Sequence, residues 1–188
     1  MHKLQRKLQT DHLHLLRLLK CLSHEIDCYD FDSQRSADLA VILSALDYMT
    51  VYSDKWHHPA EDIIFDRLLE KSVEQRDLIQ ALKNEHQTIT QETHKIHELF
   101  KNVSEDCVVS ANELLTSARH FIMLQKQHIE KESEYVYPLM DAAFSDEDWN
   151  AIEEEIILQN DPLFDESSKK EYDHLYRFIV DLEKSKQE

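Results

Sequence analysis

Residues 57–68 read HHPAEDIIFDRL and combine metal-ligating side chains with apolar ones on a single helical face. His57 and Glu61 are four residues apart, and the same face continues through Ile64 and Leu68. Residues spaced by four lie one turn apart on one side of an α-helix. A buried carboxylate is costly unless it is paired or bound to a metal. The segment therefore predicts a helix that directs an imidazole and a carboxylate into a protein core.

Apolar residues recur at helical spacing through most of the chain. We expect helices at about residues 3–28, 36–71, 72–101, 110–143, 145–158 and 168–184. Ser72 and Ser110 each begin a sequence with the spacing of a capping box. Four long helices joined by short loops are typical of an antiparallel up-and-down four-helix bundle. The predicted fold is all-α, with a bundle domain over residues 1–143 and a C-terminal extension of two shorter helices, residues 144–188, packed on it.

The composition excludes several classes of function. The 188 residues include 21 Lys+Arg and 38 Asp+Glu, and this net charge of −17 repels nucleic acids and anionic membrane surfaces. No apolar run approaches the ~20 residues that cross a bilayer, and the N-terminal sequence lacks a signal-peptide stretch, so we expect a cytoplasmic protein. The absence of glycine argues against phosphate-binding loops and nucleophile elbows. Three cysteines without CxxC spacing argue against a disulfide framework or a thiolate zinc site.

The other predicted long helices also carry polar residues where the apolar rhythm calls for leucine. His12 follows the spacing of the first helix, and His86 lies between two apolar positions of the third. His128 and Glu132 are four residues apart in the fourth, in line with the apolar Phe121 and Leu139. With a rise of 1.5 Å per residue, these positions agree in height to within about one and a half helical turns. Each predicted long helix therefore directs at least one histidine toward a shared interior layer.

His58 adds a further imidazole, because it precedes Glu61 by three residues and flanks that carboxylate. Pro59 removes one backbone donor and should disturb the helix, which would help the adjacent histidines converge. Nitrogen and oxygen ligands without thiolate suit iron, manganese or zinc. A dinuclear set of histidines and carboxylates within a helix bundle favours iron.

The ordered set H…HHxxE…H…HxxxE, together with Asp11 before His12, Glu85 before His86 and the sequence Val136-Tyr137-Pro138, resembles the hemerythrin-like (HHE cation-binding) family. The resemblance covers about residues 1–143. It implies a centre of two non-haem iron ions, with manganese or zinc as alternatives. The implied nitrogen ligands are His12, His57, His58, His86 and His128, and the implied bridging carboxylates are Glu61 and Glu132.

Oxygen-carrying hemerythrins have a second histidine four residues after the ligand of the third helix. This chain has Thr90 at that position, and His58 is the expected replacement.

The remaining histidines are interpreted as structural or superficial. His97 lies roughly 16 Å along the helix axis from His86, too far to share the centre, so we expect a structural role. We expect His94 and His120 to be interfacial or exposed, and His2, His14, His24 and His174 to lie at the surface. Core packing is the interpretation for Tyr48, Tyr52, Trp56 and Tyr135, and packing also for Cys21 and Cys28.

The leading functional hypothesis is a di-iron protein that binds a small diatomic ligand or peroxide for sensing, storage or scavenging. One alternative is a redox enzyme that reduces peroxide or donates iron to damaged iron–sulfur centres, so enzymatic activity stays open. Another is a metal-responsive interaction module, whose C-terminal helices contact a partner protein or a second copy. A metal-free helical scaffold is the fourth alternative.

Overall fold

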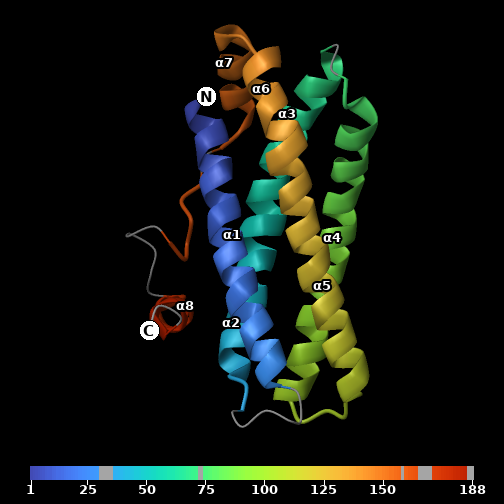
Figure 1. Ribbon diagram of the computed structural model, residues 1–188, viewed down its shortest axis with the longest axis vertical. Helices are drawn as coiled ribbons and strands as arrows, with labels where there is room; N and C mark the ends of the chain where they lie inside the picture. Colours follow the sequence, from blue (N-terminus) through green and yellow to red (C-terminus); the bar gives the residue numbers. More distant parts are fainter. Residues whose placement is uncertain (30–35, 72–73, 158, 165–170, 186–188) are drawn as a thin grey trace.

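The computed structural model describes residues 1–29, 36–71, 74–157, 159–164 and 171–185. These residues form helices and no strand, which confirms the predicted all-α class (Figure 1). The elements are α1 (Lys3–Cys28), α2 (Leu39–Tyr48), the π-helix η1 (Met49–His57), α3 (His58–Glu70), α4 (Arg76–Ser104), α5 (Ala111–Lys131), the π-helix η2 (Glu132–Val136), α6 (Tyr137–Ala143), α7 (Asp146–Glu155) and α8 (Asp173–Ser185).

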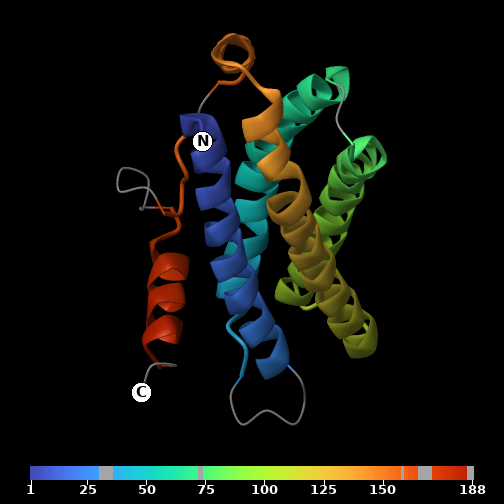
Figure 2. The same cartoon turned by 45° about the horizontal axis from the view of Figure 1, so that its top comes forward.

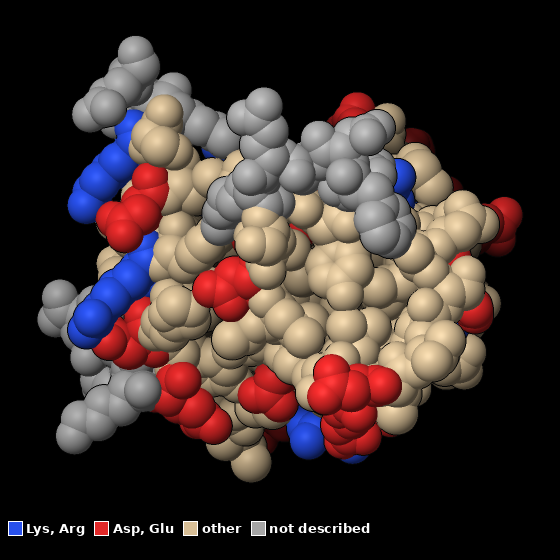
Figure 3. All heavy atoms as spheres, turned by 90° about the horizontal axis from the view of Figure 1, so that it is seen from below, with Lys and Arg blue, Asp and Glu red and all other residues tan. Residues whose placement is uncertain are grey.

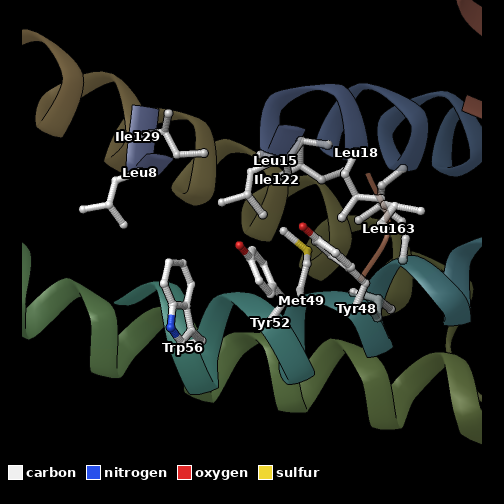
Figure 4. Packing of buried hydrophobic residues seen from close by; sticks show 14 of the residues in the cluster. Leu8, Leu15, Leu18, Tyr48, Met49, Tyr52, Trp56, Ile122, Ile129 and Leu163 are labelled. Atoms are coloured by element: carbon white, nitrogen blue, oxygen red, sulfur yellow. The ribbon is translucent and has the colours of Figure 1, made fainter. Parts of the chain in front are cut away.

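Four long rods lie side by side along the molecule: α1, the run α2–η1–α3, α4, and the run α5–η2–α6 (Figures 1 and 2). α1 packs against α2 and α5, while α4 packs against α2, α3 and α5. Buried leucines of α1, such as Leu8 and Leu15, face Met49 and Tyr52 of η1 across the interior (Figure 4). Each such burial contributes about 1.5–3 kcal/mol, so the apolar faces supply much of the driving force for folding.

The helix predicted at 36–71 begins at Leu39, because Asp38 caps it. The Asp38 carboxylate accepts the backbone N–H groups of Ala40 and Val41 at 3.0 and 3.2 Å. The rod is also not one regular helix, since η1 interrupts it over nine residues. Pro59 follows directly and has no N–H to continue an α-helical ladder. The disturbance expected near Pro59 is therefore a π-helical segment.

A second π-helix, η2, interrupts the helix predicted at 110–143 and corrects its register. The prediction placed Leu139 and Tyr135 in the core, but Leu139 is only half-buried and Tyr135 is 45% exposed. A π turn takes in an extra residue and so advances the buried face along the sequence. Val136, Tyr137 and Met140 are buried in their place.

Several predicted helix ends shift. α4 starts at Arg76 rather than 72, and Gln75 before it makes no side-chain cap. Ser72 lies outside the described residues, as does most of the loop expected after α1. Ser110 does cap α5, since its Oγ accepts the backbone N–H of Glu113 at 3.4 Å.

The loop expected at 102–109 is shorter, because α4 continues to Ser104. α7 ends at Glu155 rather than at 158, and α8 begins at Asp173 rather than at 168.

The C-terminal helices pack on the rods through polar contacts as well as apolar ones. α7 contacts α3, and α8 crosses the outside of α1 and α2, so that Figure 1 shows it nearly end-on. Arg17 of α1 makes a bidentate pair with Glu183 of α8, at 2.7 and 2.9 Å. The indole of Trp56 donates to the carbonyl oxygen of Ile157 at 2.7 Å. The separation into domains at residue 143 stays a prediction.

The surface carries the charge expected from the composition. Figure 3 shows one end of the molecule, where more of the visible charged side chains are acidic than basic. Within the described residues, no helix has both the length and the apolar character that a bilayer span requires. The cytoplasmic location stays a prediction.

We predict that deletion of Val51 abolishes metal binding while helix content is retained. Val51 lies within η1 and is 43% exposed, so its side chain contributes little to the core. Its removal takes the extra residue out of η1 and rotates the chain on one side of the deletion by about 100° relative to the other. Far-UV circular dichroism and elemental analysis measure the two effects. Val51→Ala is the control and should keep its metal; a deletion variant with full metal content would contradict the prediction.

Candidate metal centre

The structure brings all seven sequence-predicted ligands together in the interior, where each is at most 3% exposed. They come from every long rod: His12 from α1; His57, His58 and Glu61 from η1 and α3; His86 from α4; and His128 and Glu132 from α5 and η2. The common interior layer expected from helix geometry is therefore present. Their role as metal ligands stays a prediction.

Glu132 lies between histidines on two sides of the cluster. Its Oε1 is 3.1 Å from His86 Nε2 and 3.0 Å from His128 Nε2. Its Oε2 is 3.2 Å from His12 Nε2. One carboxylate thus faces imidazoles from α1 with one oxygen and imidazoles from α4 and α5 with the other.

Glu61 occupies an equivalent position. Its Oε1 is 3.3 Å from His12 Nε2, and its Oε2 is 3.4 Å from His57 Nε2 and 3.5 Å from His86 Nε2. Two groups of mutually close ligand atoms share this carboxylate: His12, His57 and Glu61 form one, and His58, Glu61, His86 and His128 form the other. The arrangement has room for two cation positions with carboxylates between them.

The far ring nitrogen of each histidine has a polar neighbour, and at His86, His12 and His128 a hydrogen bond to it fixes the ring orientation. The Nδ1 atoms lie near these oxygens: His86 near Asp62 (2.8 Å), His12 near Ser133 Oγ (3.0 Å), His128 near Glu85 (3.2 Å), His58 near Asp54 (3.5 Å) and His57 near Asp11 (3.6 Å). Metal-binding histidines usually have such a partner, which also raises their basicity.

Asp11 and Glu85 each lie beside a histidine of a neighbouring rod. Each directly precedes a predicted ligand, His12 or His86, but serves a histidine of another rod. Asp11 of α1 faces His57 of η1, and Glu85 of α4 faces His128 of α5. The Asp-His and Glu-His pairs therefore link neighbouring helices around the centre.

Sequence reasoning missed two polar groups that lie at the centre. The Tyr137 hydroxyl donates to Glu61 Oε1 at 2.5 Å, lies 3.1 Å from His12 Nε2, and its ring stacks on His12. Ser53 Oγ is 3.3 Å from His58 Nε2. The signal for Ser53 is its distance of five residues from His58, which is the spacing of a π-helix. For Tyr137 the signal is a tyrosine next to a proline after the HxxxE motif.

The remaining histidines lie outside the two groups. His94 and His120 are exposed, His97 is half-buried, and the side chain of His174 is 65% exposed, in line with the predictions. His14 differs from its expected place at the open surface, because its Nδ1 lies 2.8 Å from the buried Asp161. This contact joins α1 to the segment before α8.

Electrostatics in the metal-free centre keep most of these imidazoles charged. Burial lowers the pKa of His12, but hydrogen bonds to Glu132 and Glu61 outweigh it and raise the pKa to about 9. Burial also lowers the pKa of His86, but hydrogen bonds to Asp62 and Glu132 outweigh this effect and raise the pKa to about 10. Burial and mutual repulsion favour neutral Glu61 and Glu132, yet the surrounding histidines hold both pKa values below normal. His58 differs, because burial lowers its pKa to about 4 and leaves it neutral.

The residues fit a bound cation. Within the part of the chain that the structure describes, Glu61 Oε2, Glu132 Oε2 and His128 Nε2 are buried and make no well-aligned hydrogen bond, although ring nitrogens or carboxylate oxygens lie 3.0–3.5 Å from them. Leaving buried polar atoms without partners costs about 1–3 kcal/mol each. A cation between the carboxylates would satisfy all three atoms. The donors are nitrogen and oxygen without thiolate, as iron, manganese or zinc accept.

A cavity of 390 Å³ leads from the surface toward the centre between η1–α3 and α4. His58 and His86 form its inner wall, and Asp54 and Asp62 also line it. Thr90, at the position where oxygen-carrying hemerythrins have a histidine, lines the same cavity. The smaller threonine side chain leaves this space beside the centre open.

The described residues form helices and bury five imidazoles and two carboxylates together, which is a donor set suited to binding cations. The profile of the hemerythrin HHE cation binding domain matches residues 4–140. The chain therefore belongs to this family, as the sequence motifs indicated, and metal binding is the property that the domain and the cluster share. No curated protein and no solved structure matches the chain.

We predict that the metal-free protein loses stability as the pH rises. A group whose pKa is higher in the folded than in the unfolded protein stabilises the folded state. The stabilisation is complete at a pH below the pKa in the unfolded protein, here about 6.5, and is lost as the pH rises through the pKa in the folded protein. For His12 and His86 the folded values are about 9 and about 10. The free energy of unfolding should therefore fall between pH 6.5 and 10. Denaturant titrations of the metal-free protein measure it.

The metal-loaded protein should show a weaker dependence, because its ligand imidazoles are already neutral. His12→Asn should reduce the slope in the metal-free protein, whereas the exposed control His94→Asn should not. Equal slopes in the metal-free and loaded proteins would contradict the electrostatic account.

Proposed function

We propose that this chain holds two non-haem iron ions and uses them to bind or react with a small ligand, namely oxygen, nitric oxide or peroxide. The frame is an antiparallel up-and-down four-helix bundle over residues 1–143, with residues 144–188 as an extension. The observation that carries the proposal is the position of Glu61 and Glu132, each within 3.5 Å of imidazoles on two sides. Shared carboxylates among histidines are the donor set of di-iron sites in helix bundles.

The two iron positions have unequal ligand sets. His12 and His57 would hold one ion, and His58, His86 and His128 the other, with Glu61 and Glu132 shared. The ions would supply Lewis acidity and one-electron redox chemistry. The position with two imidazoles would have fewer protein ligands, and the Tyr137 hydroxyl lies there.

The protein's own residues shape the chemistry at both proposed ion positions. The Tyr137 hydroxyl holds a proton 2.5 Å from Glu61 Oε1, where it can donate to a ligand oxygen. Asp62 and Glu85 hold His86 and His128 in one orientation from outside. The cavity beside His58 and Thr90 is wide enough for small molecules, while the buried apolar residues around the centre keep bulk water out.

The extension beyond the bundle is supported by where the family match stops. The profile ends at residue 140, within α6, and α7 begins at Asp146. α8 lies on the outside of α1 and α2 and contributes none of the seven proposed ligands (Figure 2). It therefore offers a surface for a second copy or a partner protein without disturbing the centre.

We predict that anaerobically loaded protein retains about two irons per chain and that His57→Ala and Glu132→Ala lose most of this metal. His57→Ala removes a proposed ligand from one position, and Glu132→Ala removes a carboxylate shared by both. Elemental analysis after gel filtration measures the stoichiometry. His94→Ala, on the exposed face of α4, is the matched control and should keep both irons. Full iron content in both ligand variants, or none in the wild type, would refute the proposal.

We predict that the anaerobic ferrous protein gains visible absorption on exposure to oxygen or nitric oxide. Its oxidised form should respond to azide in the same way, because an exogenous ligand on ferric iron produces charge-transfer bands. Zinc-loaded protein is the control, since zinc has no redox chemistry. An iron-loaded protein whose spectrum responds to none of these ligands would count against a role in ligand binding.

A further inference from the structure

A row of aromatic side chains leads away from the proposed centre along one face of α2 and η1. Tyr48, Tyr52 and Trp56 recur every four residues and point to the same side (Figure 4). Their ring centroids are 5.5 Å apart for Tyr48 and Tyr52, and 5.3 Å for Tyr52 and Trp56. Trp56 lies beside His57, with centroids 6.4 Å apart. The row therefore ends at a proposed iron ligand.

Tyr172 continues the row at its outer end. This residue, just before α8, packs edge-on against Tyr48 with centroids 5.8 Å apart. It lines a surface cavity of 330 Å³, together with Asp47, His97 and Lys101. The row thus connects the centre to a second cavity, which like the ligand cavity is lined by α4 but lies further along the rods, with no gap larger than 6.4 Å between ring centres.

Two tyrosines of the row donate their hydroxyl group to a carboxylate. Tyr52 donates to Asp11 Oδ1 at 3.1 Å, and Tyr172 donates to Asp47 Oδ2 at 2.9 Å. Burial, followed by the nearby Asp161 carboxylate, raises the pKa of Tyr48 well above normal. A tyrosine gives up its phenolic proton when it loses an electron, so a nearby base is what tyrosine oxidation requires.

Core packing alone does not explain why this row contains tyrosines. Tyr48, Tyr52 and Tyr172 are at most 4% exposed, and each brings a hydroxyl into the interior that needs a polar partner. Phenylalanine or leucine would fill the same space without burying a hydroxyl group. The hydroxyl groups and their carboxylates therefore point to a function beyond filling the core.

We infer that Trp56, Tyr52, Tyr48 and Tyr172 form an electron-transfer relay between the metal centre and the cavity at Tyr172, where an external one-electron reductant docks. The inference rests on the proposed function, because its inner end is the iron ligand His57. The relay supplies electrons for reduction of hydrogen peroxide at the centre, and so favours the redox-enzyme alternative.

The step balances with peroxide as the oxidant. Reduction of one hydrogen peroxide to two water molecules consumes two electrons and two protons. The reductant delivers the electrons singly, and the two protons come from solvent. When Tyr172 passes an electron inward, its phenolic proton moves to Asp47; when the reductant replaces the electron, the proton returns.

Lys7 determines where an electron hole rests within the row. Its ammonium group lies over the rings of Tyr52 and Trp56, at 5.5 and 5.0 Å from their centroids, and donates to the Tyr52 hydroxyl at 2.8 Å. A nearby cation disfavours a positively charged indole ring. It has less effect on a neutral tyrosyl radical, whose proton has already moved to a carboxylate. The hole therefore passes through Trp56 and rests on the tyrosines.

The experiment compares wild type with Tyr52→Phe and Tyr172→Phe after iron loading. Each sample receives excess hydrogen peroxide and is frozen for electron paramagnetic resonance, which detects tyrosyl radicals. Peroxide consumption is also measured with hexaammineruthenium(II) as the reductant. Phenylalanine keeps the ring but is not oxidised, so packing is preserved. Tyr29→Phe, a tyrosine outside the row that packs on Phe100, is the matched control. Elemental analysis reports iron content for every sample.

We expect a tyrosyl radical and steady peroxide consumption in the wild type and in Tyr29→Phe. Tyr52→Phe should lower both several-fold at unchanged iron content. Tyr172→Phe should lower consumption and shift the radical to a tyrosine with different hyperfine splitting. A wild-type rate and a wild-type radical in Tyr52→Phe would overturn the relay but leave the di-iron proposal intact. The same holds if the radical is lost only in a further variant, Tyr137→Phe. An iron-free wild type would overturn both proposals.

Discussion

The burial of two carboxylates in one interior layer is the constraint on which the rest of the structure depends. Glu61 and Glu132 are fully buried and would repel one another in an apolar core. Five imidazoles surround them, and without metal the charge is balanced by protons on residues such as His12 and His86. We expect bound cations to replace those protons. The same geometry therefore serves the metal-free fold and the proposed loaded centre, and metal binding releases protons.

Both π-helices border this layer, and each is followed by a proline. η1 ends at His57, two residues before Pro59, and η2 begins at Glu132 and ends two residues before Pro138. A π turn has poorer hydrogen-bond geometry than an α turn and persists mainly at functional sites. Here it lets His57 and His58, which are adjacent in sequence, both direct ring nitrogens inward. It also carries Tyr137 into the core against His12.

The sequence allowed the helical class, the buried faces and the convergence of seven polar residues to be predicted, because all three follow from a regular 3.6-residue period. That period fails where the helix is not regular. Leu139 was placed in the core from Phe121, eighteen residues earlier, and the extra residue in η2 moved the buried position to Met140. Contacts between distant segments, such as Asp11 with His57 or His14 with Asp161, leave no periodic signal. Tyr48, Tyr52 and Trp56 were correctly placed in the core, but their hydrogen bonds could not be predicted from spacing.

The two sides of the proposed centre differ in a way that unites ligand binding with electron supply. On the side of three imidazoles, His86 and His128 have a carboxylate at hydrogen-bond distance behind them, Asp62 and Glu85, and Asp54 lies 3.5 Å from His58. On the other side, His57 faces Asp11 from 3.6 Å, while His12 has only the Ser133 hydroxyl. Carboxylate partners make imidazoles stronger donors, so an ion held by His12 and His57 is the more electron-poor of the two. That side also holds the Tyr137 hydroxyl and, through His57, meets the end of the aromatic row. An electron that the proposed relay delivered there would reach the position with fewer imidazoles, next to the Tyr137 hydroxyl, which can supply a proton.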